Sequence, residues 1–517
     1  MLHSLIEVKT LGLTAFPAKV LSNQLLPDVS RLQSIRAEEW RQLKARLQNI
    51  GLTEEYVGKI TKVGEQLLDI ASPPLRNWHA RRMSDSAAYA MRMLMLDDAV
   101  TFQEAELALG KILLDKLIEA GLVLSREDRK LVSPFRMVVG NGLYILCDDL
   151  VIGEDAVMGA GDTTNTLCQA SYPRRSIENM LDLGCGAGSC ALLFAHMATR
   201  VLATDINPRA IALSRLNATM NGISNIDFRV GDLFDPLEGE TFDLIVSQPP
   251  YCALPCGVER RAFLHGGVRG DELPLKVLSQ VARHLRPGGR AILLVEWPEI
   301  QGQSIEERIA SAVPSNDANI LILKYPTRGL DDFCTRYAAI DYPDLGTEFE
   351  RSAILRREHL ESLAVCGLTQ TVIVVQRNSA GLRWSGTFEI PAQDADWVTS
   401  ARIDKLVAAR DLLAAGRCQL LAACLRVPEG TVFAKEYALG KPDQPKFTVH
   451  FPHQALGGTM GLSQGAVLLV TLVDEAPDVN SAVERFAKQE LLTLDQALER
   501  LVPGLEEALL TGMLEVA

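Results

Sequence analysis

One segment of the chain limits its fold more than any other: from Asn179 to about Arg377, short apolar runs alternate with helical segments. The runs predicted as strands are Met180–Leu183, Arg200–Thr204, Asp227–Val230, Asp243–Ser247, Ala291–Glu296, Ile320–Lys324 and Thr371–Val375. The helices predicted between them are Gly188–Met197, Arg209–Asn221 and Leu273–Leu285. Strands that alternate with helices imply an α/β fold with a largely parallel sheet covered on both faces.

The residues before this segment predict two further units. Residues 1–74 are predicted to be helical, because Leu32–Leu47 carries apolar residues at helical spacing. Residues 75–150 resemble a winged helix, in which three helices precede a small β-ribbon. The predicted helices are Ser84–Leu96, Thr101–Leu109 and Lys111–Ala120, and the β-like runs are Leu131–Val139 and Leu143–Leu146.

The whole chain has 517 residues, which is too long for one ordinary core. Two domains are predicted in the part that follows residue 150. The α/β segment and the stretch leading into it give a domain of residues 151–378. Residues 379–517 predict a separate α+β accessory domain. Its strand-like runs are Thr431–Ala434 and Ala466–Leu472, and Leu491–Met513 is predicted as an amphipathic helical end.

Composition argues against several classes of function. The net charge of -13 and the pI near 5.3 speak against broad nucleic-acid binding, which needs Lys/Arg-rich surfaces. No apolar run approaches the roughly 20 residues that span a bilayer, and Glu7 and Lys9 interrupt the apolar stretch Met1–Lys19, which argues against a secretory signal. The ten cysteines are scattered, as reduced thiols are. We expect a cytoplasmic protein without a membrane partner.

The winged-helix-like unit also has a DNA-binding interpretation, which charge disfavours. The basic residues of its second and third helices and the following turn are Lys111, Lys116 and Arg126. Acidic residues accompany them, namely Glu104, Glu106, Asp115 and Glu119. A helix that reads the major groove is normally more basic. We therefore favour a packing or substrate-covering role for this unit.

Leu181–Gly188 reads Leu-Asp-Leu-Gly-Cys-Gly-Ala-Gly, in which a predicted strand leads into a glycine-rich turn and a helix. Glycines let the backbone approach a ligand closely, and the helix start presents free N–H groups. Asp205 closes the second strand, where a carboxylate can accept hydrogen bonds from both ribose hydroxyls. Dinucleotide-binding folds share these features, so the later motifs decide between the two kinds of nucleotide site.

Three later motifs differ from those of a dehydrogenase. Gly231-Asp232-Leu233 ends the third strand, Ser247-Gln248-Pro249-Pro250-Tyr251 ends the fourth, and Leu285–Gly289 forms the turn before the fifth. The ordered set resembles the class I methyltransferases, in the branch with an (Asn/Asp)-Pro-Pro-(Tyr/Phe) motif. That branch includes the release-factor glutamine methyltransferases and enzymes that methylate exocyclic amino groups of bases. The resemblance implies a Rossmann-like domain that uses S-adenosyl-L-methionine and releases S-adenosyl-L-homocysteine.

The same resemblance assigns a cofactor site along the carboxyl ends of the strands. Asp182, Gly184 and Gly186 would surround the methionine moiety, and Asp205 would hold the ribose. Asp232 and the backbone of Leu233 would hold the adenine. Ile206 and Gln248 complete the expected set of cofactor-binding residues.

The acceptor site is expected at Gln248, Pro249 and Tyr251. In the family, the amide oxygen of the first residue and the next backbone carbonyl accept hydrogen bonds from a planar NH2 group, and the aromatic residue stacks on that plane. Gln248 supplies the same amide oxygen as Asn on a side chain one methylene longer, and an offset of about 1 Å matters for reaction geometry. Because of this departure, the motif leaves open which substrate is methylated and on which atom.

Two segments beside the motifs carry further expectations. Val157–Leu167 resembles a loop of a bacterial methyltransferase branch with an extra N-terminal domain, and it would either close over the cofactor or link domains; we favour closure. The stretch from Arg260 to Asp271 is rich in glycine and is expected to be a mobile loop. Its arginines, Arg260, Arg261 and Arg269, would pair with an anionic substrate group or form an ordinary solvated loop.

Cys252 and Cys256 stand close to the acceptor motif, but zinc would need two more ligands and no Cys or His pair is near in sequence. His450 and His453 are the distant alternative. No activating base is evident for Cys252 as a nucleophile. We therefore expect neither a metal site nor a cysteine nucleophile.

The expected function is methylation of a nitrogen of a small metabolite in a specialised biosynthetic pathway. The alternatives are a protein or peptide glutamine-type N-methyltransferase, an RNA base N-methyltransferase, and a non-catalytic winged-helix regulator. The partner is thus a small-molecule or peptide substrate, anionic if the arginines bind it, and not a nucleic acid. A metabolite enzyme should have a closed, mostly apolar pocket beside Tyr251.

Overall fold

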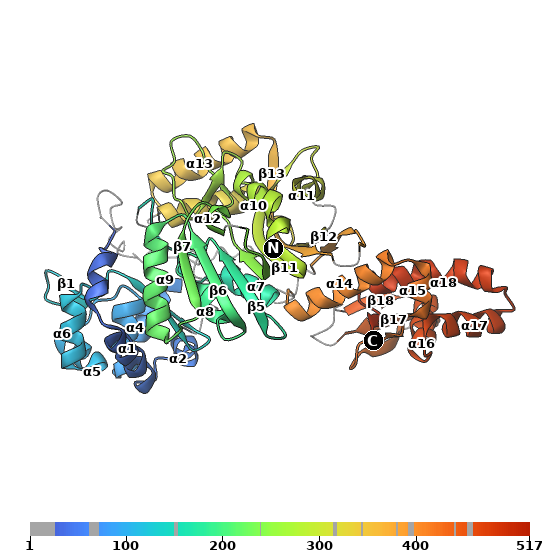
Figure 1. Cartoon of the computed structure of the whole chain (residues 1–517), viewed down its shortest axis with the longest axis horizontal. Coiled ribbons are helices and arrows are strands. Elements are labelled where there is room, and N and C mark those ends of the chain that lie inside the picture. The colour runs from blue at the N-terminus through green and yellow to red at the C-terminus, as the bar shows by residue number, and fades with distance from the viewer. Residues whose placement is uncertain are drawn as a thin grey trace, which may run out of the picture.

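The computed structural model describes residues 26–61, 72–148, 153–237, 239–313, 318–342, 345–378, 381–390, 398–438, 441–451 and 459–517. The N-terminal segment Met1–Lys19 lies outside this range. Figure 1 shows three bodies along the long axis: N-terminal helices, a central sheet with its helices, and a C-terminal body. In the described part of the chain no helix is long and apolar enough to cross a membrane.

An eight-stranded sheet forms the centre, in the order β14-β12-β13-β11-β8-β5-β6-β7. Strand β13 runs antiparallel to β11 and β12, whereas the other neighbours in the sheet are parallel. The strands are β5 (Ile177–Leu183), β6 (Ala198–Asp205), β7 (Ile226–Val230), β8 (Phe242–Ser247), β11 (Leu285–Ile300), β12 (Ala318–Lys324), β13 (Val365–Arg377) and β14 (Ser385–Glu389). Every strand predicted from the alternation of apolar runs is present, and the largely parallel sheet is confirmed.

Helices cover both faces of the sheet, because successive strand residues point to opposite sides. On one face Val201, Val246 and Leu294 join a buried cluster with residues of α8 (Ser189–Phe194), α9 (Pro208–Asn221) and α14 (Ser400–Ala414). On the other face Leu202, Ile245 and Leu293 pack with α10 (Glu272–Val281), η3 (Ala282–His284) and α11 (Ile305–Ala312). The loop after β7 carries η2 (Asp235–Leu237).

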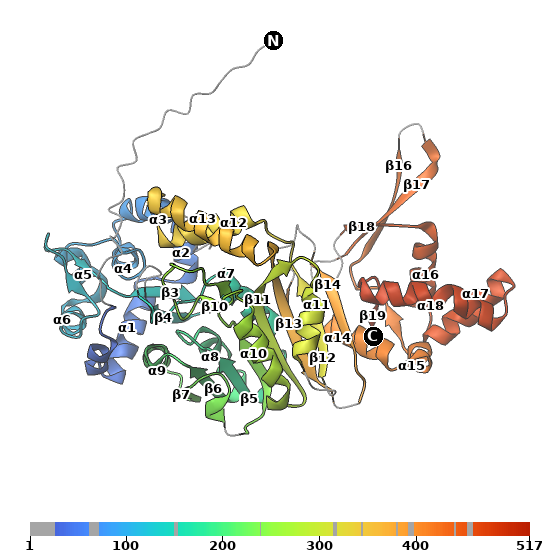
Figure 2. The ribbon, with the colours of Figure 1, turned by 90° about the horizontal axis from the view of Figure 1, so that it is seen from above.

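A third layer of helices lies beyond the carboxyl end of β8. Helices α12 (Leu330–Asp341) and α13 (Thr347–Ser362) pack together, and both contact β13. Their buried residues, including Phe333, Tyr337 and Leu360, form a cluster with Cys252 and Ala253, which directly follow the acceptor motif. Figure 2 shows α12 and α13 in yellow on the side of the sheet where α3 also lies. The helical layer therefore forms a wall above the predicted acceptor site.

The N-terminal body contains the winged-helix-like unit. Helices α4 (Ser86–Met95), α5 (Phe102–Leu109) and α6 (Lys111–Glu119) precede the β1–β2 ribbon, and Val100 bridges to Leu131 of that ribbon. The remaining elements are η1 (Val29–Ser34), α1 (Ala37–Asn49), α2 (Glu54–Thr61), α3 (Ser72–Arg81), β1 (Leu124–Ser125), β2 (Leu131–Val132), β3 (Arg136–Gly140) and β4 (Leu143–Cys147). The predicted strand Leu131–Val139 is thus two strands, because Ser133-Pro134-Phe135 turns the chain between them.

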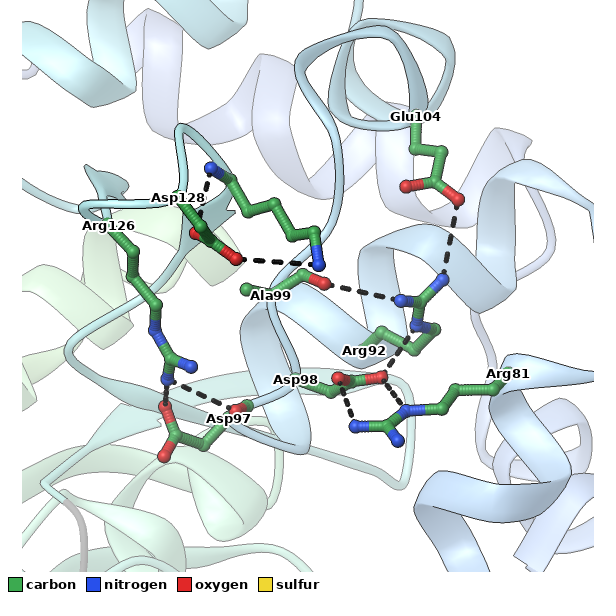
Figure 3. Close-up of polar contacts among 9 residues, drawn as sticks. Arg81, Arg92, Asp97, Asp98, Ala99, Glu104, Arg126 and Asp128 are labelled. Carbon is green, nitrogen blue, oxygen red and sulfur yellow. Dashed lines mark hydrogen bonds and ion pairs between the residues drawn. The ribbon is translucent and has the colours of Figure 1, made fainter. Parts of the chain in front are cut away.

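Several arginines of this body pair with acids of the same body. Asp98 is buried and accepts hydrogen bonds from Arg81 (2.7 and 2.9 Å) and Arg92 (2.7 Å), which joins α3 to α4 (Figure 3). Burial acts to raise the pKa of Asp98, but the two guanidinium groups outweigh it and lower the pKa. Arg126 likewise pairs with Asp97 at 2.9 Å. Arginines that are paired within the protein suit a packing role better than a DNA-binding surface.

The C-terminal body is an α+β unit, as predicted, with one error. It comprises α15 (Arg417–Ala422), β15 (Leu425–Arg426), β16 (Val432–Ala438), β17 (Lys441–His450), β18 (Thr459–Leu462), α16 (Gln464–Asp474), α17 (Val479–Glu490), α18 (Leu494–Leu510) and β19 (Glu515–Val516). The run Ala466–Leu472 was predicted as strand-like and is wrong, since it lies within α16. Ser463 caps this helix by accepting from the Ala466 N–H, and Val470 and Val473 are buried at helical spacing.

The central domain extends past the predicted boundary at residue 378. Strand β14 (Ser385–Glu389) pairs with β12 and forms the sheet edge. Helix α14 (Ser400–Ala414) contributes Ile403, Leu406 and Val407 to the sheet's buried cluster. The sequence pattern did not reveal these two elements for a physical reason. Strand β14 is short, and helix α14 has no strongly one-sided apolar face.

Candidate active site

The predicted glycine turn joins β5 to α8 in an open conformation. Gly184, Gly186 and Gly188 have φ values of +75°, +54° and +85°, a region that side chains disfavour. A β-carbon on Gly184 would meet no atom within 4 Å. The turn therefore offers bare backbone at the carboxyl end of β5, which suits the close approach of a ligand.

Asp205 ends β6 and faces this turn. One of its carboxylate oxygens accepts the Gly186 N–H and the other accepts the Asn207 N–H, each at 2.9 Å. Burial raises the pKa of Asp205. A carboxylate has about four acceptor positions, so two remain for the hydroxyls of a ribose. The next residue, Ile206, is 62% exposed and offers an apolar face for a base.

Asp182 points into the protein. Its carboxylate is buried and accepts the Ala191 N–H at 2.8 Å, at the start of α8. Burial raises the pKa of Asp182 to about 7, and the negative charge of Asp205 adds to the shift. The side chain holds the glycine turn and α8 together, so its expected place beside the methionine moiety stays a prediction.

Asp232 and Leu233 follow β7 at the same edge of the sheet. The Asp232 carboxylate pairs with the ammonium of Lys276 on α10 at 2.8 Å, and both side chains are about half exposed. Leu233 has a positive φ of +49°, which turns its backbone sharply after the strand. The structure thus brings the glycine turn, Asp205, Ile206 and this pair to one edge, in the order expected for a nucleotide site.

The acceptor motif follows β8. The Gln248 Nε2 donates a hydrogen bond to Thr163 Oγ1 at 2.7 Å. The amide nitrogen is thereby engaged, and the Oε1 atom is the part of the amide that remains to accept. Gln248, Pro249 and Tyr251 all line a cavity of about 1430 Å³. The cavity lies between the N-terminal body, α7 (Asp162–Ser171) and the second half of α12, with Met91, Arg136 and Arg328 also in its wall.

The segment Val157–Leu167 lies against both predicted sites. The Met158 carbonyl oxygen is 3.6 Å from the position that a β-carbon would take on Gly186. Thr163 bonds Gln248, and Gly159 packs so tightly against Cys147 of β4 that a β-carbon there would come within 2.6 Å of the Cys147 sulfur. These contacts favour the interpretation that the segment closes over the cofactor, rather than the one in which it links two domains. Its second half is the first part of helix α7.

Glu296 and Tyr337 are site residues that the sequence interpretation missed. Glu296 lies in β11, is 4% exposed, and lines the cavity with Tyr251 and Tyr337. Burial and the nearby Glu296 charge raise the pKa of the Tyr251 hydroxyl. A signal for Glu296 did exist, because it ends a predicted apolar strand just as Asp205 does. Tyr337 sits in α12, far along the chain, and has no local signal.

The expectation of a mobile, substrate-binding arginine loop is wrong for two of the three arginines. Arg261 is buried and pairs with Asp341 of α12 at 2.8 Å, and Arg269 pairs with the fully buried Asp271 at 2.9 Å. A β-carbon on Gly266 would come within 2.3 Å of the Pro250 carbonyl oxygen. The glycines thus permit tight packing beneath the motif. Of the three arginines, Arg260 alone is exposed.

Neither cysteine of the motif region has a metal-binding environment. Cys252 is fully buried in β9 (Cys252–Ala253), which pairs with β10 (His265–Gly267), whereas Cys256 is exposed. Burial raises the pKa of the Cys252 thiol, which disfavours the nucleophilic thiolate. Among the described residues no group of three His, Cys, Asp or Glu side chains is placed to hold a metal ion.

Comparisons with known proteins agree with this geometry. A family model described as a methyltransferase domain matches residues 175–318. A release factor glutamine methyltransferase of Xylella fastidiosa is 32% identical over 200 residues, which cover 36% of this chain and 71% of that protein. A ribosomal protein uL3 glutamine methyltransferase of Bradyrhizobium diazoefficiens is 32% identical over 202 residues, or 35% and 61% of the two chains.

Among solved structures, Trm5b from Pyrococcus abyssi is 16% identical with a TM-score of 0.31, covering 50% of this chain and 62% of that one. A likeness this low adds nothing to the assignment.

An open α/β sheet, a glycine turn with an acidic residue at the end of the next strand, and a matching methyltransferase model together define the class of S-adenosylmethionine-dependent methyltransferases. The chain belongs to the class I enzymes of this kind, in the branch of the release factor glutamine methyltransferases. S-adenosylmethionine is therefore the methyl donor, and the protein is an enzyme. The glycine turn, the half-satisfied Asp205 and the exposed Ile206 fit that cofactor.

Proposed function

We propose that the enzyme methylates the side-chain amide nitrogen of a glutamine residue in a protein. The observation that carries this proposal is the hydrogen bond from Gln248 Nε2 to Thr163 Oγ1. It fixes the amide so that Oε1 is left to accept from a substrate NH2 group, the role that Asn plays in relatives of this branch. The longer Gln side chain is accommodated because α7 supplies its partner.

The proposed roles divide between the two ligands. S-adenosylmethionine supplies an electrophilic methyl group. The Gln248 Oε1 and the Pro249 carbonyl would orient the acceptor nitrogen, and Tyr251 would form one wall of its pocket. Gly184, Gly186 and the buried Asp182 would shape the methionine end of the cofactor site, Asp205 would hold the ribose, and Asp232, Leu233 and Ile206 would flank the adenine.

Two observations favour a protein acceptor over the small metabolite expected from the sequence. The relatives named above are glutamine methyltransferases of a release factor and of a ribosomal protein. The cavity of about 1430 Å³ also exceeds the ~300–1,000 Å³ of ordinary small-ligand pockets. A peptide segment that presents one glutamine would use such a volume.

Methyl transfer from labelled S-adenosylmethionine to purified bacterial release factor and to ribosomal protein uL3 tests the proposal. We expect one added methyl group on a glutamine side chain, located by tandem mass spectrometry. Label that appears only in the small-molecule fraction of a cell extract would replace this proposal with the metabolite activity. Gln248→Ala should abolish transfer to the glutamine.

A further inference from the structure

The register between strands β8 and β11 places Glu296 beside the acceptor motif. In the parallel pair β8–β11, Leu293 lies opposite Ser247, the last residue of β8. Glu296 is three residues further along β11, level with the start of the Pro-Pro-Tyr turn. Side chains alternate along a strand, so Glu296 shares the face of Ile292 and Leu294, the face that continues into the cavity.

One carboxylate oxygen of Glu296 has no hydrogen bond in the described structure. The Oε1 atom is buried and lacks a donor, and the nearest guanidinium nitrogen, Arg328 Nη1, is 3.8 Å away. That distance exceeds a hydrogen bond. Leaving a buried acceptor unpaired is costly, and native proteins rarely do so without a function. A donor brought by a ligand in the cavity would satisfy it.

The groups around Glu296 come from several elements. Tyr251 lies on the motif segment, Arg328 precedes α12, and Tyr337 and Arg336 belong to α12; Asp332, also on α12, is the other nearby acid. Gln370 lies opposite Glu296 on β13. The positive charges of Arg328 and Arg336 act on the Glu296 carboxylate and favour its charged form.

We propose that Glu296 is a catalytic residue: its carboxylate accepts a hydrogen bond from the N–H of the acceptor carboxamide and takes the proton that methylation releases. This inference rests on the proposed function. The acceptor nitrogen has only two hydrogens, so Glu296 would share one of them with Gln248 Oε1 or with the Pro249 carbonyl, and this shared hydrogen is the proton that departs.

The step balances in atoms and charge. The acceptor nitrogen forms a bond to the methyl carbon, and the carbon–sulfur bond breaks with its electron pair staying on sulfur. The sulfonium donor thereby becomes a neutral thioether. The nitrogen loses one proton to the Glu296 carboxylate, which later passes it to water through the open side of the cavity.

The test uses the full chain saturated with S-adenosylhomocysteine and a blocked glutamine, N-acetylglutamine methylamide, as the probe. Calorimetry compares the wild type with Glu296→Gln, which keeps the size of the side chain and removes its charge. We expect the variant to bind the probe about tenfold more weakly, as for the loss of a charge-assisted hydrogen bond. Where methyl transfer to a protein glutamine is observed, kcat should fall about 100-fold, the lower range for a general base.

Glu358→Gln is the matched control, since it makes the same change of charge at an exposed position of α13. It should bind the probe as the wild type does, and all three proteins should bind S-adenosylhomocysteine equally. Equal probe binding by wild type and Glu296→Gln would overturn the role of Glu296 and leave the proposed function standing. A wild type that binds S-adenosylhomocysteine and not the probe would overturn both.

Discussion

The cofactor edge and the acceptor cavity satisfy their polar groups in different ways. At the cofactor edge each acid has a partner in the protein: Asp205 has two backbone N–H groups, Asp182 has one, and Asp232 has Lys276. In the cavity one carboxylate oxygen of Glu296 has no hydrogen-bond donor, and the Oε1 atom of Gln248 remains available to accept a hydrogen bond. The first region is thus assembled before its ligand arrives, whereas the second is completed by its ligand.

The helical layer above the acceptor site offers the strongest test of this comparison, because α12 and α13 contain an ion-pair network that needs no ligand. Asp341 pairs with the buried Arg261 at 2.8 Å and with Arg356 at 2.6 Å. Asp341→Ala leaves two buried guanidinium groups unpaired and should lower the free energy of unfolding by about 3–5 kcal/mol. Urea unfolding measures it, with the half-exposed Asp332→Ala as control at below about 1 kcal/mol. Equal losses in the two variants would mean that the wall does not depend on Asp341.

The second prediction concerns pH at the cofactor edge. The pKa of Asp182 is about 7 in the folded protein and about 3.9 unfolded. Its contribution to stability is therefore complete below pH 4 and is lost as pH rises through 7. Asp182→Asn cannot ionise, so its stability relative to wild type should rise by about 3 kcal/mol between pH 5 and pH 8. Thermal melts at both pH values measure this, beside the exposed Asp235→Asn; a gain that does not change with pH would contradict it.

Asp205→Ala sharpens the comparison on the ligand side. The variant loses the carboxylate proposed for the ribose and frees the N–H groups of Gly186 and Asn207. Two hydrogen bonds to a charged group correspond to about 100-fold in S-adenosylmethionine affinity. Isothermal titration measures the Kd, and Asp235→Ala should leave it unchanged. Retained affinity would move the ribose site elsewhere.

The smallest expected effect is that of Thr163→Val, which removes the partner of Gln248 without changing size. The amide should rotate more freely and kcat should fall about tenfold through lost alignment, whereas the Kd for S-adenosylmethionine stays the same. Thr163→Ser keeps the hydroxyl and should restore kcat. If valine and serine variants turn over alike, Gln248 is oriented by something other than this hydrogen bond.

The sequence predicted the sheet and the cofactor edge well because both are local. Glycines 184–188 follow their strand directly, and Asp205 and Asp232 each end the next strand, so topology alone brings them together. Thr163, Tyr337 and Asp341 come from α7 and α12, and only tertiary packing carries them to the motif. The arginine loop was misread for the same reason, since the partner of Arg261 lies on a helix about 80 residues further on.

Segment Met158–Thr163 touches the glycine turn at one end and Gln248 at the other. A ligand that repositions this segment at either end therefore changes affinity at the opposite end, and thermodynamics requires the two effects to be equal in size. Donor and acceptor are then not two independent equilibria. The factor by which S-adenosylhomocysteine tightens binding of a glutamine acceptor is the same factor by which the acceptor tightens binding of S-adenosylhomocysteine.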